Sequence, residues 1–402
     1  MCRGLSIYYK KTHKDFYGRD LMKLDEFVLE NWLNPAANSP LTKIYLGGSC
    51  VLPMTVEELF ELTGESLDDF IEELKKMNLG YGFFAGTPRL RTAVANLYKD
   101  VTDEDVILVH GGTGANNTVV YTLIEPTDNV ISIMPNYQQF DSLPKSIGAE
   151  VREVKLRPED AYKLNLDEVR KVVDKNTKAI LLTNPNNPTG SLISLEEMQE
   201  LVDIAKSVDA WIVCDEMYRG LKEDYMYSMV DIYDKAIVTC SSSKIYSMAG
   251  TRCGWIICRD PEVRWDLFNR RSYDSICGGV FDEWIFAIAL EHADKIFARS
   301  RDIVAQNKAV IDKWLDGHKY LRQYADSYGT TYLVHYDLDV NSVEFCDNLL
   351  EQKGVLVCHG DSFYIPHTFR ITLSHAEELE EGLALIDEYI DELVAQGKAL
   401  NK

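Results

Sequence analysis

The segment SSSKIYSMAGTRCGW, residues 241–255, places Lys244 directly after three serines, and Arg252 follows eight residues later. A lysine that sheds its charge through burial or neighbouring cations can act as a nucleophile or a base. A lysine near serines is more often only part of a solvated loop. The segment alone does not decide between these two interpretations, so the rest of the chain must.

Four other strand-like runs are also followed by residues that could bind a ligand. The run DVILVH leads into GGTGANN, residues 111–117, and then into an expected helix, TVVYTLI. Free backbone N–H groups at such a junction suit a phosphate. The other three runs end beside an aromatic residue, an amide, and a carboxylate with a phenol. The residues concerned are Gly112, Thr113, Tyr137, Asn187, Asp215 and Tyr218.

Each of these positions also has an interpretation without a ligand. The glycines could close a tight turn, Tyr137 could pack at a rim, and NNPTG, residues 186–190, could be a plain rigid turn. Asp215 is harder to explain, because a carboxylate at the end of a buried strand needs a partner. Taken together, phosphate donors, an aromatic face, an amide, a carboxylate and an amine suit an aromatic, phosphorylated aldehyde with a ring nitrogen. That description fits pyridoxal 5′-phosphate (PLP).

The elements that must position these residues form a regular alternation of strands and helices. Several strand-like runs have few polar positions, as expected for strands buried on both faces of a mainly parallel sheet. Between them lie helical patterns such as residues 195–208. This alternation predicts a doubly wound α/β domain, in which ligands bind at the carboxyl ends of the strands. The runs are 105–110, 129–135, 149–156, 178–185, 210–216, 236–243 and 254–260.

The C-terminal part has a different pattern. A long helical region near 281–316 precedes strand-like 330–338, helical 342–354, strand-like 369–374 and a final helix around 376–396. This order predicts a smaller α+β domain. We therefore expect three parts. They are an N-terminal segment, 1–45, packing on the small domain or a partner subunit; a large PLP-binding domain, 46–280; and a small C-terminal domain, 281–402.

The composition is that of an ordinary globular protein, with 46% hydrophobic and 10% aromatic residues in a chain of 402. Asp and Glu outnumber Lys and Arg by 64 to 42, which gives a net charge of −22. Such a charge argues against nucleic acid or an anionic membrane as the main partner. Because the net negative charge of the protein repels anions, an anionic ligand must be held by nearby hydrogen-bond donors and cations.

The nine cysteines show no CxxC pair and no metal-like Cys/His spacing. This pattern indicates reduced thiols in a cytosolic protein and no metal site. The N-terminus lacks the apolar region of a signal peptide. No apolar run approaches the roughly 20 residues that a membrane span needs. We therefore expect a soluble, cytoplasmic protein.

Four motifs carry a family resemblance. TNPNNPTG, CDEMY, SSSK and GTRCGW, in this order and with these separations, resemble the fold-type I PLP-dependent aminotransferases, the class I/II aminotransferase family. The resemblance runs from about Tyr81 to Arg370 and covers most of the chain. It implies the PLP-dependent transferase fold, with helices on both sides of the large sheet and a smaller α+β domain. It also implies PLP as cofactor.

The resemblance implies roles around the cofactor ring. Lys244 matches the lysine that forms the internal aldimine and then moves the proton between the substrate Cα and the cofactor. Asp215 matches the carboxylate that keeps the pyridine nitrogen protonated. Asn187 and Tyr218 match the pair that hydrogen-bonds the ring's O3′, and Tyr137 matches the stacked aromatic residue. The implied catalytic residues are Lys244, Asp215 and Tyr218.

Other matching residues are expected to hold the phosphate and the substrate. Tyr81, in YGFFAG, matches a tyrosine that reaches the phosphate of a neighbouring subunit, which implies a homodimer with the active site at its interface. Arg370, in FRITLS, matches the arginine that binds the substrate α-carboxylate in a bidentate fork; Asn187 is expected beside it. Without the resemblance, Arg370 would be assigned to a surface ion pair. The expected phosphate ligands are Gly112, Thr113, Ser241, Ser243 and Arg252.

Three positions depart from the usual family pattern. Ser242 replaces an apolar or aromatic residue, and Cys253 replaces an aliphatic residue after the arginine. Gly114 stands where an acidic or polar residue is usual, which loosens the turn without removing donors. All three substitutions are small and compatible with the implied function.

The implied residues support removal of the α-proton of an amino acid and, by default, transamination to an α-keto acid. The same residues also support elimination and cyclisation. The segments LENWL, YLGGSC and GVLVCHGDSF resemble a subgroup near capreomycidine synthase, which cyclises a hydroxylated arginine derivative. A C–S lyase is a further alternative. An alternative of another class is a non-catalytic PLP-binding regulatory module.

Overall fold

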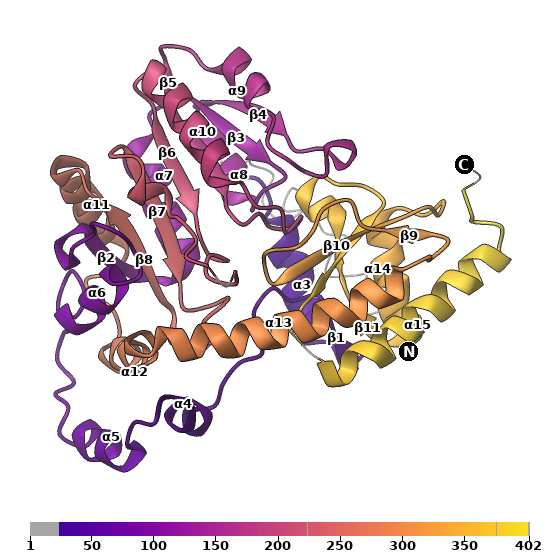
Figure 1. Cartoon of the computed structure of the whole chain (residues 1–402), viewed down its shortest axis with the longest axis horizontal. Helices are drawn as coiled ribbons and strands as arrows, with labels where there is room; N and C mark the ends of the chain where they lie inside the picture. The colour runs from indigo at the N-terminus through magenta and orange to yellow at the C-terminus, as the bar shows by residue number, and fades with distance from the viewer. Residues whose placement is uncertain (1–23, 223, 375, 401–402) are drawn as a thin grey trace, which may run out of the picture.

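The computed structural model describes residues 24–222, 224–374 and 376–400, which form two units of strands and helices (Figure 1). The larger unit is built on a seven-stranded sheet and the smaller one on a four-stranded sheet. The long helix α13 (Ala293–Leu315) runs between them. The α/β fold class predicted from the sequence is confirmed.

The large sheet has the strand order β2-β8-β7-β6-β5-β3-β4. Neighbouring strands are parallel except at β8, which is antiparallel to both β2 and β7. Each of the seven predicted runs contributes one strand, so the prediction of a mainly parallel sheet is confirmed. The strands are β2 (Val106–His110), β3 (Asn129–Met134), β4 (Glu150–Lys155), β5 (Thr177–Thr183), β6 (Trp211–Asp215), β7 (Ala236–Ser241) and β8 (Cys253–Cys258).

Helices pack on both faces of this sheet. The core on one face includes side chains of α4 (Val56–Thr63), α6 (Pro88–Ala95), α9 (Leu166–Val172), α10 (Leu195–Ser207) and α12 (Val280–Glu291). The core on the other face includes side chains of α7 (Gly111–Leu123), α8 (Gln139–Ile147) and α11 (Pro261–Asp274). Helix α5 (Leu67–Leu74) buries no residue and lies at the lower left beside α4 (Figure 1).

Local sequence explains where several helices begin. Ser194 caps α10, and Glu197 three residues later completes a capping box. The side chain of Asp260 accepts hydrogen bonds from the backbone N–H groups of Glu262 and Val263 in the first turn of α11, which begins with Pro261. Helix α7 begins at Gly111, seven residues before the predicted helix. The glycines are therefore the first turn of the helix itself rather than a loop before it.

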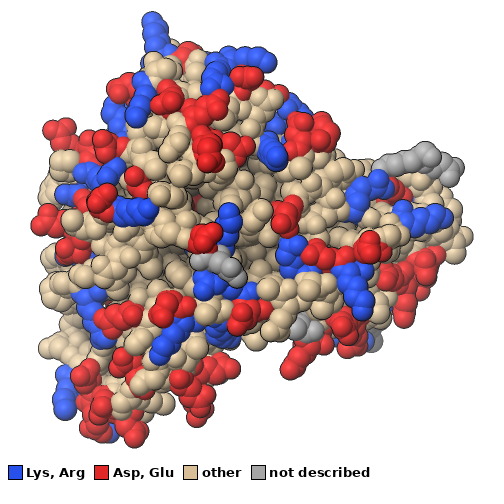
Figure 2. Space-filling view, viewed as in Figure 1, with Lys and Arg blue, Asp and Glu red and all other residues tan. Residues whose placement is uncertain are grey.

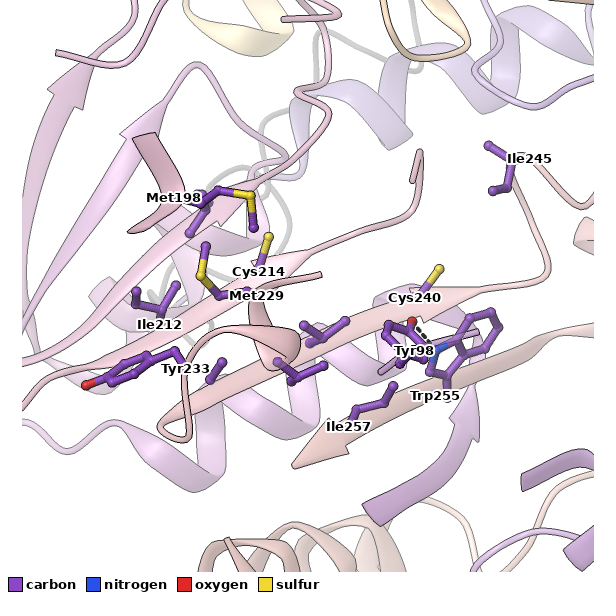
Figure 3. Close-up of a cluster of buried hydrophobic side chains, with 14 of the residues drawn as sticks. Tyr98, Met198, Ile212, Cys214, Met229, Tyr233, Cys240, Ile245, Trp255 and Ile257 are labelled. Atoms are coloured by element: carbon purple, nitrogen blue, oxygen red, sulfur yellow. Dashed lines mark hydrogen bonds between the residues drawn. The ribbon is translucent and has the colours of Figure 1, made fainter. Parts of the chain in front are cut away.

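The interior of the large domain is apolar with few polar atoms. Trp255 is fully buried, and its indole N–H donates a 2.9 Å hydrogen bond to the hydroxyl of Tyr98 (Figure 3). Cys214 and Cys240 lie among apolar side chains in the same cluster, as the prediction of core-filling thiols requires. This packing holds the large sheet in place, and the carboxyl ends of its strands carry the predicted site residues.

The small domain is an antiparallel sheet of order β12-β13-β10-β9, covered by helices. A separate two-stranded parallel pairing joins β1 to β11. The N-terminal helix α3 packs in this core through Leu29, Trp32 and Leu33. The elements are α3 (Val28–Ala37), β1 (Ile44–Tyr45), β9 (Leu321–Arg322), β10 (Thr331–Tyr336), α14 (Ser342–Lys353), β11 (Val355–Leu356), β12 (Cys358–His359), β13 (Thr368–Thr372) and α15 (Ala376–Ala395).

The apolar cores of the large and the small domain indicate where the boundary between the two domains lies. Phe286 of α12 and Ile296 near the start of α13 belong to the large-domain core. Val304 and Ile311, later in α13, belong to the small-domain core. We therefore propose a division within α13 rather than at residue 281, because α12 packs on the large sheet. Residues 1–23 of the expected N-terminal segment lie outside the described residues.

The surface carries both signs of charge. In the view of Figure 2, acidic residues gather over α4 and α5 and along α15. No helix in the described residues is long and apolar enough to span a membrane. No group of three or more His, Cys, Asp or Glu side chains that could hold a metal ion occurs in those residues.

Candidate active site

A cavity of about 720 Å³ lies at the carboxyl ends of the large-domain strands and is closed from the other side by α3 and the segment after β1. It brings together every site residue expected from the sequence except Tyr81. Those residues are Gly112, Thr113, Tyr137, Asn187, Asp215, Tyr218, Ser241, Ser243, Lys244, Arg252 and Arg370. They come from distant parts of the chain and share one space.

Asp215 lies at the base of the cavity, at the end of β6, with only 4% of its surface exposed. Its carboxylate accepts hydrogen bonds from Asn116 Nδ2 at 3.0 Å and from the backbone N–H of Met217 at 3.1 Å. Asn116 is oriented by the hydroxyl of Thr239, which donates to its Oδ1 at 2.6 Å. Burial raises the pKa of Asp215 to about 6, against the effect of these hydrogen bonds. A protonated ring nitrogen would supply the partner that this buried carboxylate needs.

Lys244 follows β7, and its side chain points to the segment after β1. Its Nζ donates to Ser49 Oγ at 2.8 Å and lies 3.8 Å from the sulfur of Cys50. The backbone N–H of Val51 donates to the Lys244 carbonyl at 3.0 Å, so the two segments are joined at two points. Burial opposes the charged amine, but Cys50 and Tyr218 outweigh it, so the pKa of Lys244 is raised.

Arg370 is a buried cation on β13, with 1% of its surface exposed. Its Nη1 donates to Asn187 Oδ1 at 2.9 Å, and its Nη2 donates to the carbonyl of Gly47 at 2.8 Å. Its Nε has no hydrogen-bond partner in the described structure. No carboxylate forms an ion pair with it among the described residues. A buried cation with neutral partners only is suited to an anionic ligand such as a carboxylate.

The glycines at the start of α7 form a place for a phosphate. A Cβ at Gly111 would overlap the guanidinium of Arg252, and one at Gly112 would overlap the side chain of Met217. The helix N-terminus, the guanidinium and the hydroxyls of Ser241 and Ser243 line the same cavity. The cluster combines a helix dipole, free N–H groups and a cation. This donor set fits the phosphate of PLP.

Tyr137 connects the large-domain wall to α3. Its hydroxyl donates to Glu30 Oε1 at 2.7 Å, and Thr113 also hydrogen-bonds to it. Burial and the Glu30 charge raise the pKa of Tyr137 well above its usual range, so its hydroxyl stays protonated. Glu30 Oε2 accepts a second hydrogen bond, 3.0 Å long, from Asn34 Nδ2 one turn along the helix.

Comparison with known families assigns residues 50–386, more than half of the chain, to the aminotransferase class I and II family. The chain belongs to this family. It is therefore a PLP-dependent enzyme, and the donor set described above fits the cofactor. The family resemblance and the cofactor predicted from the sequence are confirmed.

Individual relatives of this aminotransferase differ in the reaction they are named for. Capreomycidine synthase of Streptomyces vinaceus is 28% identical over 364 residues, which cover 90% of this chain and 92% of that protein. Aspartate aminotransferase of Thermotoga maritima is 26% identical over 357 residues, which cover 86% of this chain and 92% of that protein. A PLP-dependent aminotransferase structure from Streptococcus suis superimposes with a TM-score of 0.89 and 36% identity, covering 92% of this chain and 99% of that one.

Tyr81 is the one expected site residue that the aminotransferase chain does not bring to its own cavity. Its side chain is 79% exposed. Its neighbours Phe83 and Phe84 are exposed as well, at 60% and 57%. This placement leaves the expected role in a partner subunit as a proposal.

Sequence reasoning missed several residues that line the cavity or support it: Glu30, Ser49, Cys50, Asn116 and Thr239. Asn116 lies four residues after Gly112, which places both on one face of a helix. If the helix had been predicted to begin at the glycines, this spacing would have indicated that Asn116 faces the site. The others could not be found locally, because Glu30 and Ser49 reach the site from far away in the chain.

Proposed function

We propose that this aminotransferase transfers the amino group of an L-amino acid to an α-keto acid. One observation carries the proposal: the side chains of Lys244, Asp215 and Arg370 line one cavity, and the charges of Lys244 and Asp215 and of Lys244 and Arg370 act on each other. Asp215 suits a cofactor ring that accepts electrons from the substrate, and Arg370 suits the substrate carboxylate.

Bound PLP would supply an aldehyde for the substrate amine and a ring that accepts the electrons released at Cα. Lys244 Nζ removes the proton from the substrate Cα, since it is the one amine among the described residues that line the cavity. Ser49 Oγ holds Nζ at 2.8 Å and so orients it. Asp215 would hold a proton on the ring nitrogen of bound PLP, and Tyr218 and Asn187 would supply hydrogen bonds at its ring oxygen.

Arg370 binds the α-carboxylate and thereby fixes which face of Cα meets Lys244. Its Nε and Nη groups form a fork, and Asn187 keeps that fork in place at 2.9 Å. Helix α3 lines the cavity opposite the sheet through Leu29, Glu30, Leu33 and Asn34.

We further propose a homodimer in which Tyr81 reaches the phosphate site of the partner. The support is an exposed apolar patch formed by residues 79–84 and the nearby ends of α11 and α12. Arg271 joins the two parts, because it donates to the carbonyls of Phe84 and Ile276. The patch comprises Leu79, Tyr81, Phe83, Phe84, Tyr273, Ile276 and Phe281. Exposed patches of this kind mark protein interfaces. Light scattering should show a dimer, and Phe84→Asp should weaken it.

A second candidate reaction is elimination followed by cyclisation. The relative from Streptomyces vinaceus, matched over 90% of this chain, favours it. The hydroxyl of Ser49 and the thiol of Cys50 beside Lys244 could also give a proton to a group leaving from Cβ. A C–S lyase would use the same atoms. The non-catalytic alternative has no observation in its favour.

The test is a screen of L-amino acids with the PLP-loaded enzyme and either pyruvate or 2-oxoglutarate. Formation of a new amino acid and a new α-keto acid would support transamination. Release of ammonia without a second amino acid would support elimination instead. If no amino acid gave either product, the proposed function would be wrong.

A further inference from the structure

The charged groups that line the cavity are three cations and two anions: Lys244, Arg252, Arg370, Asp215 and Glu30. The proposed function uses four of them. In that proposal Lys244 moves the α-proton, Arg252 would hold the phosphate, Arg370 binds the α-carboxylate, and Asp215 would hold the proton of the ring nitrogen. Glu30 is the one charge among these lining residues that has no role in the chemistry.

Glu30 is held firmly, but only by neutral groups. Tyr137 and Asn34 each donate one hydrogen bond to it, at 2.7 and 3.0 Å. A carboxylate can accept about four hydrogen bonds, so each oxygen keeps a free lone pair. Glu30 forms no ion pair within the described residues. The charge is therefore available to a ligand in the cavity.

The position of Glu30 relative to the reacting groups also matters. The charges of both Glu30 and Arg370 act on the amine of Lys244 and on the thiol of Cys358. Glu30 and Arg370 also line the same cavity as Lys244. Leu29 and Leu33, on the same helix, supply apolar wall beside Glu30. An aliphatic stem with a charged end would match this combination.

We propose that Glu30 selects L-amino acids whose side chain ends in a cation, a guanidinium or an ammonium group. This inference rests on the proposed function, because it assumes that Arg370 holds the α-carboxylate. A glutamine could accept the hydrogen bond of Tyr137 with its oxygen and donate its NH2 group to the amide oxygen of a rotated Asn34, without the cost of a partly buried charge. The negative charge itself is what this neutral substitute would lack.

The first test is binding of two non-reacting ligands to the PLP-loaded enzyme, measured by calorimetry. The ligands are 5-guanidinopentanoate and 5-ureidopentanoate, which lack the α-amino group; in the second, a neutral urea oxygen replaces one NH2 group of the charged guanidinium. Glu30→Gln should weaken the guanidino ligand at least about tenfold, since a hydrogen bond to a charged group is lost, and leave the ureido ligand unchanged within about twofold. Equal effects on both ligands, or none on either, would overturn the inference.

The second test is turnover with arginine, lysine and the neutral norleucine. Glu30→Gln should lower kcat/KM for the two basic substrates and leave norleucine unchanged, and Glu30→Arg should reverse the preference. Glu26→Gln is the matched control, because Glu26 lies on the same segment and, among the described residues, its side chain is hydrogen-bonded to the exposed Asn31 alone. A wild-type enzyme that prefers neutral or acidic amino acids would overturn the inference and leave the proposed function intact. A wild-type enzyme without turnover on any amino acid would overturn both.

Discussion

The two walls of the cavity are built in different ways. The large-domain wall consists of the ends of neighbouring strands, and each of its residues lies within a short motif. The opposite wall consists of α3 and residues 47–50, which reach the site across long stretches of chain. Ser49 and Lys244 are 195 residues apart, and Glu30 and Tyr137 are 107 apart.

This difference separates chemistry from selection. The strand-end wall carries the amine, the ring partner and the phosphate donors, which any substrate of the family needs. The α3 wall carries the negative charge of Glu30 and the apolar side chains of Leu29 and Leu33, which only some substrates would contact. Changes on the first wall should remove activity. On the second wall, changes to Glu30 should alter which substrate is used, and changes to Ser49 should lower activity only slightly.

The largest effect is expected from Lys244→Ala. Loss of the amine that moves the α-proton should lower turnover by about 10²–10⁴-fold or more. The fold should remain, which circular dichroism and thermal unfolding would check. Turnover at the wild-type rate would show that another group performs the proton transfer.

A smaller effect is expected from Arg370→Lys. Lysine keeps the charge but not the planar fork, so KM for the amino acid should rise by about tenfold or more while kcat changes less. Steady-state kinetics measures both constants. An unchanged KM would place the α-carboxylate elsewhere.

Asp215 gives a prediction for pH and stability. Burial raises its pKa from 3.8 to about 6, so the folded protein holds this proton more tightly than the unfolded chain does. The PLP-free protein should therefore lose stability relative to Asp215→Asn as pH rises from about 4 to about 6, by about 3 kcal/mol. Urea unfolding of both proteins across this range measures the difference. A difference that does not change with pH would contradict the buried, proton-holding carboxylate.

The smallest effect is expected from Ser49→Ala, on the second wall. Loss of the 2.8 Å hydrogen bond to Nζ should lower kcat by about tenfold or less, with little change in KM. Cys50→Ala is the comparison variant, because its sulfur lies 3.8 Å from Nζ and Cys50 raises the pKa of Lys244, so its loss should shift the pH profile of kcat to lower pH. An equal loss of kcat in both variants without such a shift would mean that the segment matters only for packing.

The same division describes what the sequence could predict. Short runs with few polar positions identified all seven strands of the large sheet, because strands buried on both faces are apolar. Asp215 stood out at the end of such a run, Lys244 directly after one, and Arg252 eight residues after Lys244. The start of α7 was missed because glycines favour turns locally, whereas packing on β7 and β8 carries the helix back to Gly111. Glu30 and Ser49 were missed because tertiary packing alone brings them to the site.

The most direct test of the account follows the α-proton of the substrate in deuterated water by NMR, with the PLP-loaded enzyme and no keto acid. The wild type should exchange the α-proton of its preferred amino acid, and Glu30→Gln should still exchange that of norleucine. Lys244→Ala should exchange neither at a measurable rate. Exchange by Lys244→Ala at the wild-type rate would contradict the assignment of Lys244 as the group that moves this proton.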